Sequence, residues 1–173
     1  MVVAPYLDTL LLLLVAAAAI NDLVSRRIPN LLLLAGLVAA LVLHALSPEP
    51  GTALLACFGG AVLGLVLFLP FYLLRSMAAG DVKMMATVGA FTGPAVAFHI
   101  AIVAWCAGGV MALVIILFRG RLRLALNNLR GIFQRAVFGL PSGGETMTES
   151  AGSMPYGVAI AAGTIYVLMS SYA

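Results

Sequence analysis

Asp22 and Asp81 are the two residues of this 173-residue sequence whose type and position favour chemistry. Both lie at the ends of long apolar stretches, where a charged side chain is costly and is usually retained for a function. Each also has a structural explanation, because Asp22 can pair with Arg26 one helical turn later and Asp81 suits a helix N-terminus. The other acidic residues are predicted in water-solvated connections or at helix ends: Asp8, Glu49, Glu145 and Glu149.

Two carboxylates that share a water molecule can hydrolyse an amide. Their like charges repel, so one holds a proton while the other is ionised. The ionised carboxylate takes a proton from the attacking water, and the protonated one donates to the carbonyl oxygen or the leaving nitrogen. A divalent metal needs a third or fourth ligand, but His44 and His99 are predicted on the opposite side of the membrane. We therefore expect no metal and no cofactor.

The composition places these acids in an integral membrane protein. Hydrophobic residues make up 64% of the chain and charged residues 9%, with a mean hydropathy of +1.16, whereas soluble domains are about 25% charged. At about 20 residues per span, the sequence predicts an all-α fold of six transmembrane helices in one membrane-embedded domain, residues 1–173. The expected apolar stretches are residues 6–24, 30–46, 52–74, 77–91, 95–118 and 155–172.

The basic residues predict the orientation. All nine fall on the first, third and fifth connections: Arg26 and Arg27, then Arg75 and Lys83, then Arg119, Arg121, Arg123, Arg130 and Arg135. The positive-inside rule then gives an N-out, C-out protein with Asp22 and Asp81 at the cytoplasmic face. Arginines beside apolar spans indicate the membrane surface, so we expect no nucleic acid as a partner.

The fifth connection, residues 119–154, has a pattern of its own. Apolar residues recur at helical spacing between Leu122 and Phe138, and polar and basic residues fall largely between them. This pattern predicts a basic amphipathic cytoplasmic helix between helices 5 and 6, bound to anionic lipids, followed by a mobile loop at "PSGGETMTES". A solvated linker with an incidental helix is the alternative.

Gly80 and Lys83 flank the second acid. Gly80 has no Cβ, so it lets a peptide backbone approach Asp81 and permits non-helical dihedral angles. Lys83 has two interpretations, which the sequence leaves open. It is either an interfacial anchor that extends to lipid phosphates or a charge that stabilises the ionised form of one acid.

Three stretches together resemble the bacterial type IV prepilin peptidases, a family of GxGD membrane aspartyl proteases, and especially the short forms that serve Flp/Tad-type pili. "AAGDVKMMA" resembles the GxGD signature, with Ala78 in place of the first glycine. "NDLVSRRIPN" is similar to the family's first aspartate segment, in which an acid precedes a Ser and an Ile-Pro-Asn turn. "MPYGVAIAAG" is similar to its last-helix Pro-Phe-Gly element.

The resemblance implies a membrane-embedded aspartyl endopeptidase with Asp22 and Asp81 as its catalytic dyad. It implies a multi-pass protein of the bacterial inner membrane, with the active site facing the cytoplasm. The implied substrate is a pilin or pseudopilin precursor, cut after a glycine near the cytoplasmic end of its hydrophobic helix, and pilus assembly machinery is an implied partner. The residues expected to shape the site or contact substrate are Ser25, Pro29, Asn30, Gly80, Lys83, Pro155, Tyr156 and Gly157.

The sequence also limits these expectations. Longer family members carry a cysteine-rich segment linked to N-methylation, and this chain has only two isolated cysteines, so we expect cleavage without methylation. One alternative function is a small proton- or cation-coupled transporter, although transporter sites lie near the bilayer midplane and no inverted repeat is evident. Another is a catalytically silent component of a secretion-system assembly.

Overall fold

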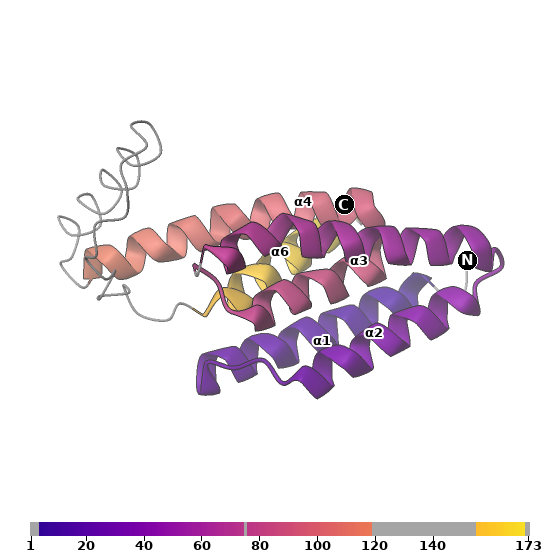
Figure 1. The fold of residues 1–173 in the computed structure, drawn as a ribbon, viewed down its shortest axis with the longest axis horizontal. Helices are drawn as coiled ribbons and strands as arrows, with labels where there is room; N and C mark the ends of the chain where they lie inside the picture. Colours follow the sequence, from indigo (N-terminus) through magenta and orange to yellow (C-terminus); the bar gives the residue numbers. More distant parts are fainter. Residues whose placement is uncertain (1–3, 75, 119–154, 172–173) are drawn as a thin grey trace. The chain divides into compact units, whose positions relative to one another are not determined.

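The computed structural model describes residues 4–74, 76–118 and 155–171, and these form five helices (Figure 1). The helices are α1 (Ala4–Ser25), α2 (Asn30–Ala45), α3 (Pro50–Leu73), α4 (Ala79–Phe118) and α6 (Tyr156–Ser171). The chain forms two compact units, residues 1–108 with 155–173 and residues 109–154. The first unit contains both aspartates. The expected amphipathic helix and loop at 119–154 lie outside the described residues.

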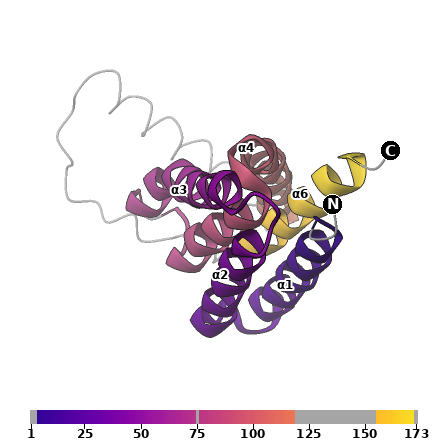
Figure 2. The ribbon, with the colours of Figure 1, turned by 90° about the vertical axis from the view of Figure 1, so that its right-hand side faces the viewer.

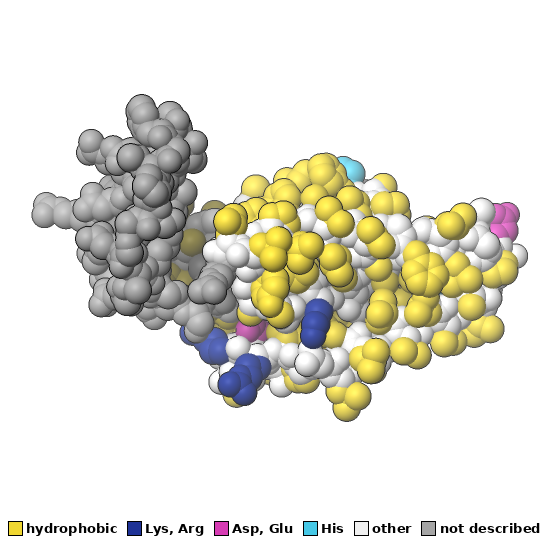
Figure 3. Space-filling view, viewed as in Figure 1, with side chains coloured by type: hydrophobic (Ala, Val, Ile, Leu, Met, Phe, Trp, Pro, Cys, Tyr) yellow, Lys and Arg dark blue, Asp and Glu magenta, His cyan; other side chains and the backbone are white. Residues whose placement is uncertain are grey.

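The described helices have the apolar surface of a membrane protein. Three of them are long and apolar enough to cross a bilayer, at Tyr6–Ser25, Pro50–Leu73 and Ala79–Phe118, and α2 and α6 are shorter apolar helices. Large hydrophobic side chains are exposed on every helix, and hydrophobic side chains of all sizes cover much of the described surface seen in Figure 3. Helices that are apolar on all sides are typical of a bilayer environment. The predicted all-α membrane fold is therefore confirmed at this level, whereas six spans and the N-out, C-out orientation remain predictions.

α4 turns back on itself at Gly93, which has φ 75° and ψ 172° and precedes Pro94. Tyr156 shows the reversal, because it interacts electrostatically with Asp81 and its hydroxyl donates to the Ala104 carbonyl. A continuous helix would separate Asp81 from Ala104 by about 35 Å, which is too far for one tyrosine. Gly93 occupies the left-handed region that favours glycine. The separation that the sequence predicts between residues 91 and 95 is thus found as a turn within α4.

Glycines bring α3 and the first half of α4 into backbone contact. A Cβ on Gly60 would collide with the Gly89 carbonyl, and one on Gly64 would collide with the Met85 carbonyl. Such close approach through small residues is a common way for helices to associate in lipid. This contact fixes the start of α4, and therefore Asp81, against α3.

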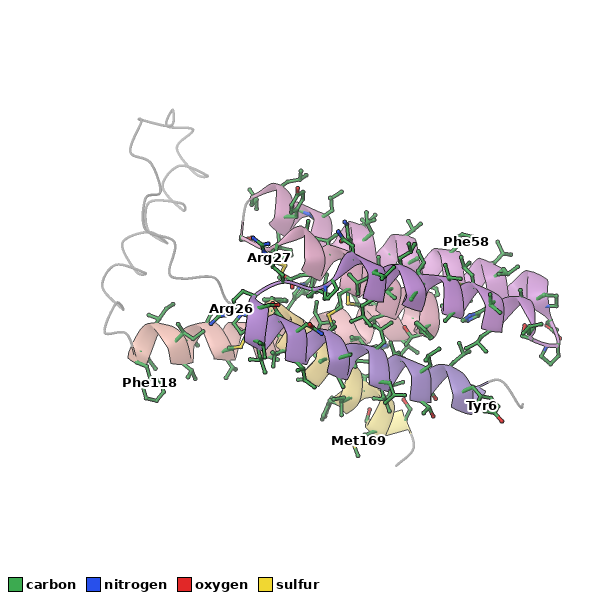
Figure 4. All side chains as sticks on the ribbon, turned by 90° about the horizontal axis from the view of Figure 1, so that it is seen from below. Tyr6, Arg26, Arg27, Phe58, Phe118 and Met169 are labelled. Atoms are coloured by element: carbon green, nitrogen blue, oxygen red, sulfur yellow. The ribbon has the colours of Figure 1, made fainter. Side chains whose placement is uncertain are left out.

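The other described helices, α1, α2 and α6, complete the bundle. α1 packs against α6 and α2, and α2 packs against α3, as the end-on view in Figure 2 shows. Arg26 and Arg27 lie at the end of α1 opposite Tyr6 (Figure 4). α1 ends there because Arg26 has φ 54°, and the extended Pro29 precedes α2.

Candidate active site

Asp22 is buried near the C-terminal end of α1, with 6% of its surface exposed. Its Oδ2 accepts a 2.9 Å hydrogen bond from the Gly157 N–H, 135 residues later in the sequence. Gly157 lies in the first turn of α6, whose backbone N–H groups have no partner within the helix. Arg26 is also within electrostatic range of Asp22, whereas the contact with Gly157 could not be read from the spacing of charges.

Asp81 is buried in the first turn of α4, with 4% of its surface exposed. Its Oδ2 accepts a 3.2 Å hydrogen bond from the Ala78 N–H, and its own N–H donates to the Ala78 carbonyl at 3.1 Å. The carboxylate of a third helical residue that reaches back to the N-cap amide is one half of a capping box. Asp81 therefore has the helix-terminus role that its position suggests.

The structure brings the two carboxylates together. Asp22 and Asp81 come from α1 and α4, and they lie close enough to interact electrostatically. Each accepts a backbone N–H from the first turn or N-cap of a helix. Helix N-termini favour negative charge, so the starts of α6 and α4 offset part of the repulsion between the acids. In a low-dielectric surrounding, two such carboxylates can hold one proton between them and activate a water molecule.

Gly157 and Gly80 stand beside the two acids in different ways. A Cβ on Gly157 would lie 2.9 Å from Asp22 Oδ2 and 3.2 Å from the Ile28 side chain. The atoms nearest to a Cβ on Gly80 would be those of Ile28, at 3.4 Å or more, which is ordinary contact. Gly80 is helical, and Gly93 is the glycine with positive φ in the described residues. Gly80 therefore does not use the non-helical dihedral angles that a glycine permits, and its role in letting a peptide backbone approach Asp81 remains a prediction.

Ile28 is a residue near the carboxylates that the sequence interpretation missed. It lies in the connection between α1 and α2, and its half-buried side chain contacts both Gly80 and Gly157. It thus packs against the neighbours of both acids. The apolar residue inside the otherwise polar stretch "SRRIPN" was the available signal, since a solvated turn has no need of it.

Ser25 and Pro29 shape the turn after α1. The Ser25 hydroxyl donates to the Asn21 and Arg27 carbonyls at 2.8 and 3.2 Å, and Pro29 holds the N-cap position of α2 with extended dihedral angles. Both residues therefore shape the backbone of the connection between α1 and α2.

Asn30 and Lys83 form a contact of their own. Lys83 Nζ donates to Asn30 Oδ1 at 3.0 Å. Since Lys83 follows Asp81 by two residues, or about 200° around the helix, it lies on the other side of α4 from the carboxylates. The structure pairs it with Asn30, and the role of Lys83 as a lipid anchor remains a prediction.

Pro155 and Tyr156 open α6 beside the site. α6 begins at Tyr156, so Pro155 directly precedes the helix. Tyr156 is buried, and its hydroxyl donates to the Ala104 carbonyl at 3.3 Å. Its ring packs edge-on against that of Phe68, with 6.0 Å between the ring centroids. A Cβ on Gly108 would collide with the tyrosine ring. The ring therefore ties the start of α6 to the second half of α4.

The fold and the site define a helical membrane protein with a buried pair of carboxylates held at helix N-termini. The residues that the structure describes include no group of three His, Cys, Asp or Glu side chains able to hold a metal ion. The two carboxylates of this arrangement are suited to acid–base chemistry.

Residues 9–113 match the sequence model of the type IV leader peptidase family, and the chain therefore belongs to this family and is a peptidase. The matched range contains both Asp22 and Asp81, whereas Pro155, Tyr156 and Gly157 lie beyond it. Comparisons with curated proteins and with solved structures gave no match.

Proposed function

We propose that this protein is an aspartic endopeptidase that removes the leader of type IV or Flp-type pilin precursors, with Asp22 and Asp81 as its catalytic pair. The observation that carries the proposal is the burial of two mutually interacting carboxylates that come from different helices. Ionisable groups within a membrane protein are expensive and mark functional sites. Membership of the leader peptidase family supports the same reaction class.

The proposed mechanism uses one carboxylate as base and the other as acid. The ionised carboxylate removes a proton from water while the water oxygen attacks the scissile carbonyl carbon. The protonated carboxylate donates to the carbonyl oxygen. When the C–N bond breaks, the first carboxylate passes the proton that it took from water to the leaving nitrogen, and the second carboxylate takes back a proton from a hydroxyl of the tetrahedral intermediate. The Gly157 and Ala78 amides hold one oxygen of each carboxylate, which fixes the orientation of both groups before substrate binds.

The substrate proposal combines the family with the charge pattern. A precursor with a polar leader and an apolar helix can enter from lipid while its leader stays in water. Its scissile bond then meets acids at the inner face, where the positive-inside rule places Asp22 and Asp81. The active site would face the cytoplasm of a bacterial inner-membrane protein. Cys57 and Cys106 are separate free thiols, so we expect leader cleavage without N-methylation.

Co-expression with pilin precursors of the same genome tests this proposal. We expect a size shift of the precursor with the wild-type chain and none with Asp22→Asn or Asp81→Asn, while all variants remain in the membrane fraction. Asp8→Asn and Glu49→Gln are matched controls that remove a carboxylate elsewhere and should cleave normally. Cleavage at the wild-type rate by either dyad variant would exclude that residue. A protein that moves protons or cations and never cleaves precursor would point to transport.

A further inference from the structure

A groove of about 750 Å³ lies on the other side of α4 from the carboxylates, between α2, α3 and the first turns of α4. Its walls are mainly apolar, with Leu34 and Leu37 from α2 and Val62 and Leu65 from α3. Lining residues 30–37 of α2 correspond to about 10 Å of helix. The groove therefore has the length and the surface to hold part of an acyl chain.

A polar pair stands at one end of this groove. Lys83 and Asn30 both line it, and Lys83 Nζ donates to Asn30 Oδ1 at 3.0 Å. An ammonium group has three donors, so this bond leaves two for another acceptor. Lys83 is exposed and is the only lysine of the chain. Its end of the groove is the end of α2 that follows Arg26 and Arg27, so positive charge gathers there.

A second groove in the same unit has no charged lining residue and serves as a comparison. It has a volume of about 580 Å³, lies against α1 and α2, and is lined by residues such as Leu10, Val38 and Leu43, with no charged or polar side chain. Any lipid tail can occupy such a surface. Only the groove that contains Lys83 also offers a cation and an amide to a headgroup.

We infer that the groove between α2, α3 and α4 is a binding site for one anionic phospholipid, with its phosphate at Lys83 and Asn30 and an acyl chain between the helices. Basic pockets between transmembrane helices on the cytoplasmic side suit anionic headgroups. A substrate helix fits less well, because Lys83 and Asp81 lie on opposite sides of α4 and a peptide in the groove would be separated from the acids. The site is independent of the proposed peptidase activity.

Native mass spectrometry of the purified chain in detergent tests the site through binding alone. We expect phosphatidylglycerol to be retained more tightly than phosphatidylcholine with the same acyl chains. Lys83→Met, which keeps an apolar stem, should weaken phosphatidylglycerol retention roughly fivefold, the effect of one lysine near an anionic surface. Arg27→Gln removes an equal charge at the same end of the bundle, outside the groove, and should retain the lipid as the wild type does. Equal weakening in both variants, or none in Lys83→Met, would overturn the inference.

Two further measurements distinguish a bound phospholipid from other occupants of the groove. Ala61→Phe fills the groove at a lining residue and should reduce binding of both lipids, whereas Ala39→Phe fills the uncharged groove and should leave the phosphatidylglycerol preference unchanged. Glycerol phosphate, which lacks acyl chains, should not displace the lipid. Displacement by glycerol phosphate would instead indicate a site for free phosphate. Displacement by the apolar helix of a pilin precursor would indicate a substrate site. Because the wild-type comparison of the two lipids needs no variant, misfolding of a variant cannot conceal a negative result.

Discussion

Asp22 and Asp81 are held by the same chemistry but by segments of different origin. The amide on Asp81 belongs to Ala78, three residues earlier, whereas the amide on Asp22 belongs to Gly157, 135 residues later. The Asp81 carboxylate is therefore oriented as soon as α4 begins, whereas the Asp22 carboxylate is oriented only when α1 packs against α6. One half of the pair depends on local sequence and the other on the tertiary fold.

The largest expected effect comes from removing either carboxylate. Asp22→Asn and Asp81→Asn keep the side-chain shape but cannot act as base, so we expect precursor cleavage to fall by about 10²–10⁴-fold in each. Because the two acids work as a unit, the double variant should lose little more than either single one. Single-turnover cleavage in detergent measures this, with thermal unfolding as the control for folding.

The single and double variants also test whether the two carboxylates act as a pair. If the losses multiplied in the double variant, the two acids would be acting independently and the pair mechanism would be wrong. If only Asp81→Asn lost activity, the carboxylate held by the tertiary contact would be a structural residue that caps α6.

Gly157→Ala is expected to have the second largest effect. The added Cβ would lie 2.9 Å from Asp22 Oδ2, so the carboxylate must shift, and misplacement by about 1 Å can cost roughly 100-fold in rate. We expect a lower kcat at nearly unchanged KM. Gly80→Ala is the matched control beside Asp81, because the atoms nearest to its added Cβ are those of Ile28 at ordinary contact distance. Since this Cβ does not displace a carboxylate, the loss of kcat should be at least tenfold smaller than in Gly157→Ala. Equal losses of kcat would show that the apparent crowding at Gly157 does not govern Asp22.

Much of the local half of the site could be predicted from the sequence. The acid after Gly80, the turn at "SRRIPN" and the break before Pro94 follow from rules that act over a few residues. The Gly157 amide, the Ile28 contacts and the Lys83–Asn30 bond could not be predicted, since they join helices far apart in the chain. Gly80 is an ordinary helical residue, and its expected role in letting a peptide backbone approach Asp81 stays a prediction.

Tyr156→Phe should have a smaller effect, mainly on stability. The change removes the hydroxyl that donates to the Ala104 carbonyl at 3.3 Å and keeps the edge-on contact with Phe68. One neutral hydrogen bond contributes about 1 kcal/mol, so for a chain of this length the midpoint of thermal unfolding should fall by about 2–4 °C. Precursor cleavage by the folded protein should stay near wild type. A large loss of cleavage at unchanged stability would assign the hydroxyl to the chemistry of the neighbouring Asp81.

The smallest expected effect is that of Ala78→Gly, which restores the first glycine of the GxGD signature. Ala78 holds the N-cap position before α4, and the group that contacts Asp81 is its backbone N–H. Glycine keeps this N–H, so cleavage should remain within about twofold of wild type. Glycine is also much better than alanine at an N-cap, so stability should rise by roughly 0.5–1 kcal/mol. Ala78→Pro is the informative partner, because proline has no N–H to donate. It should reduce kcat as Gly157→Ala does on the other side of the pair. If glycine and proline at residue 78 gave the same rate, the local amide would not orient Asp81, and the two carboxylates would both depend on tertiary packing alone.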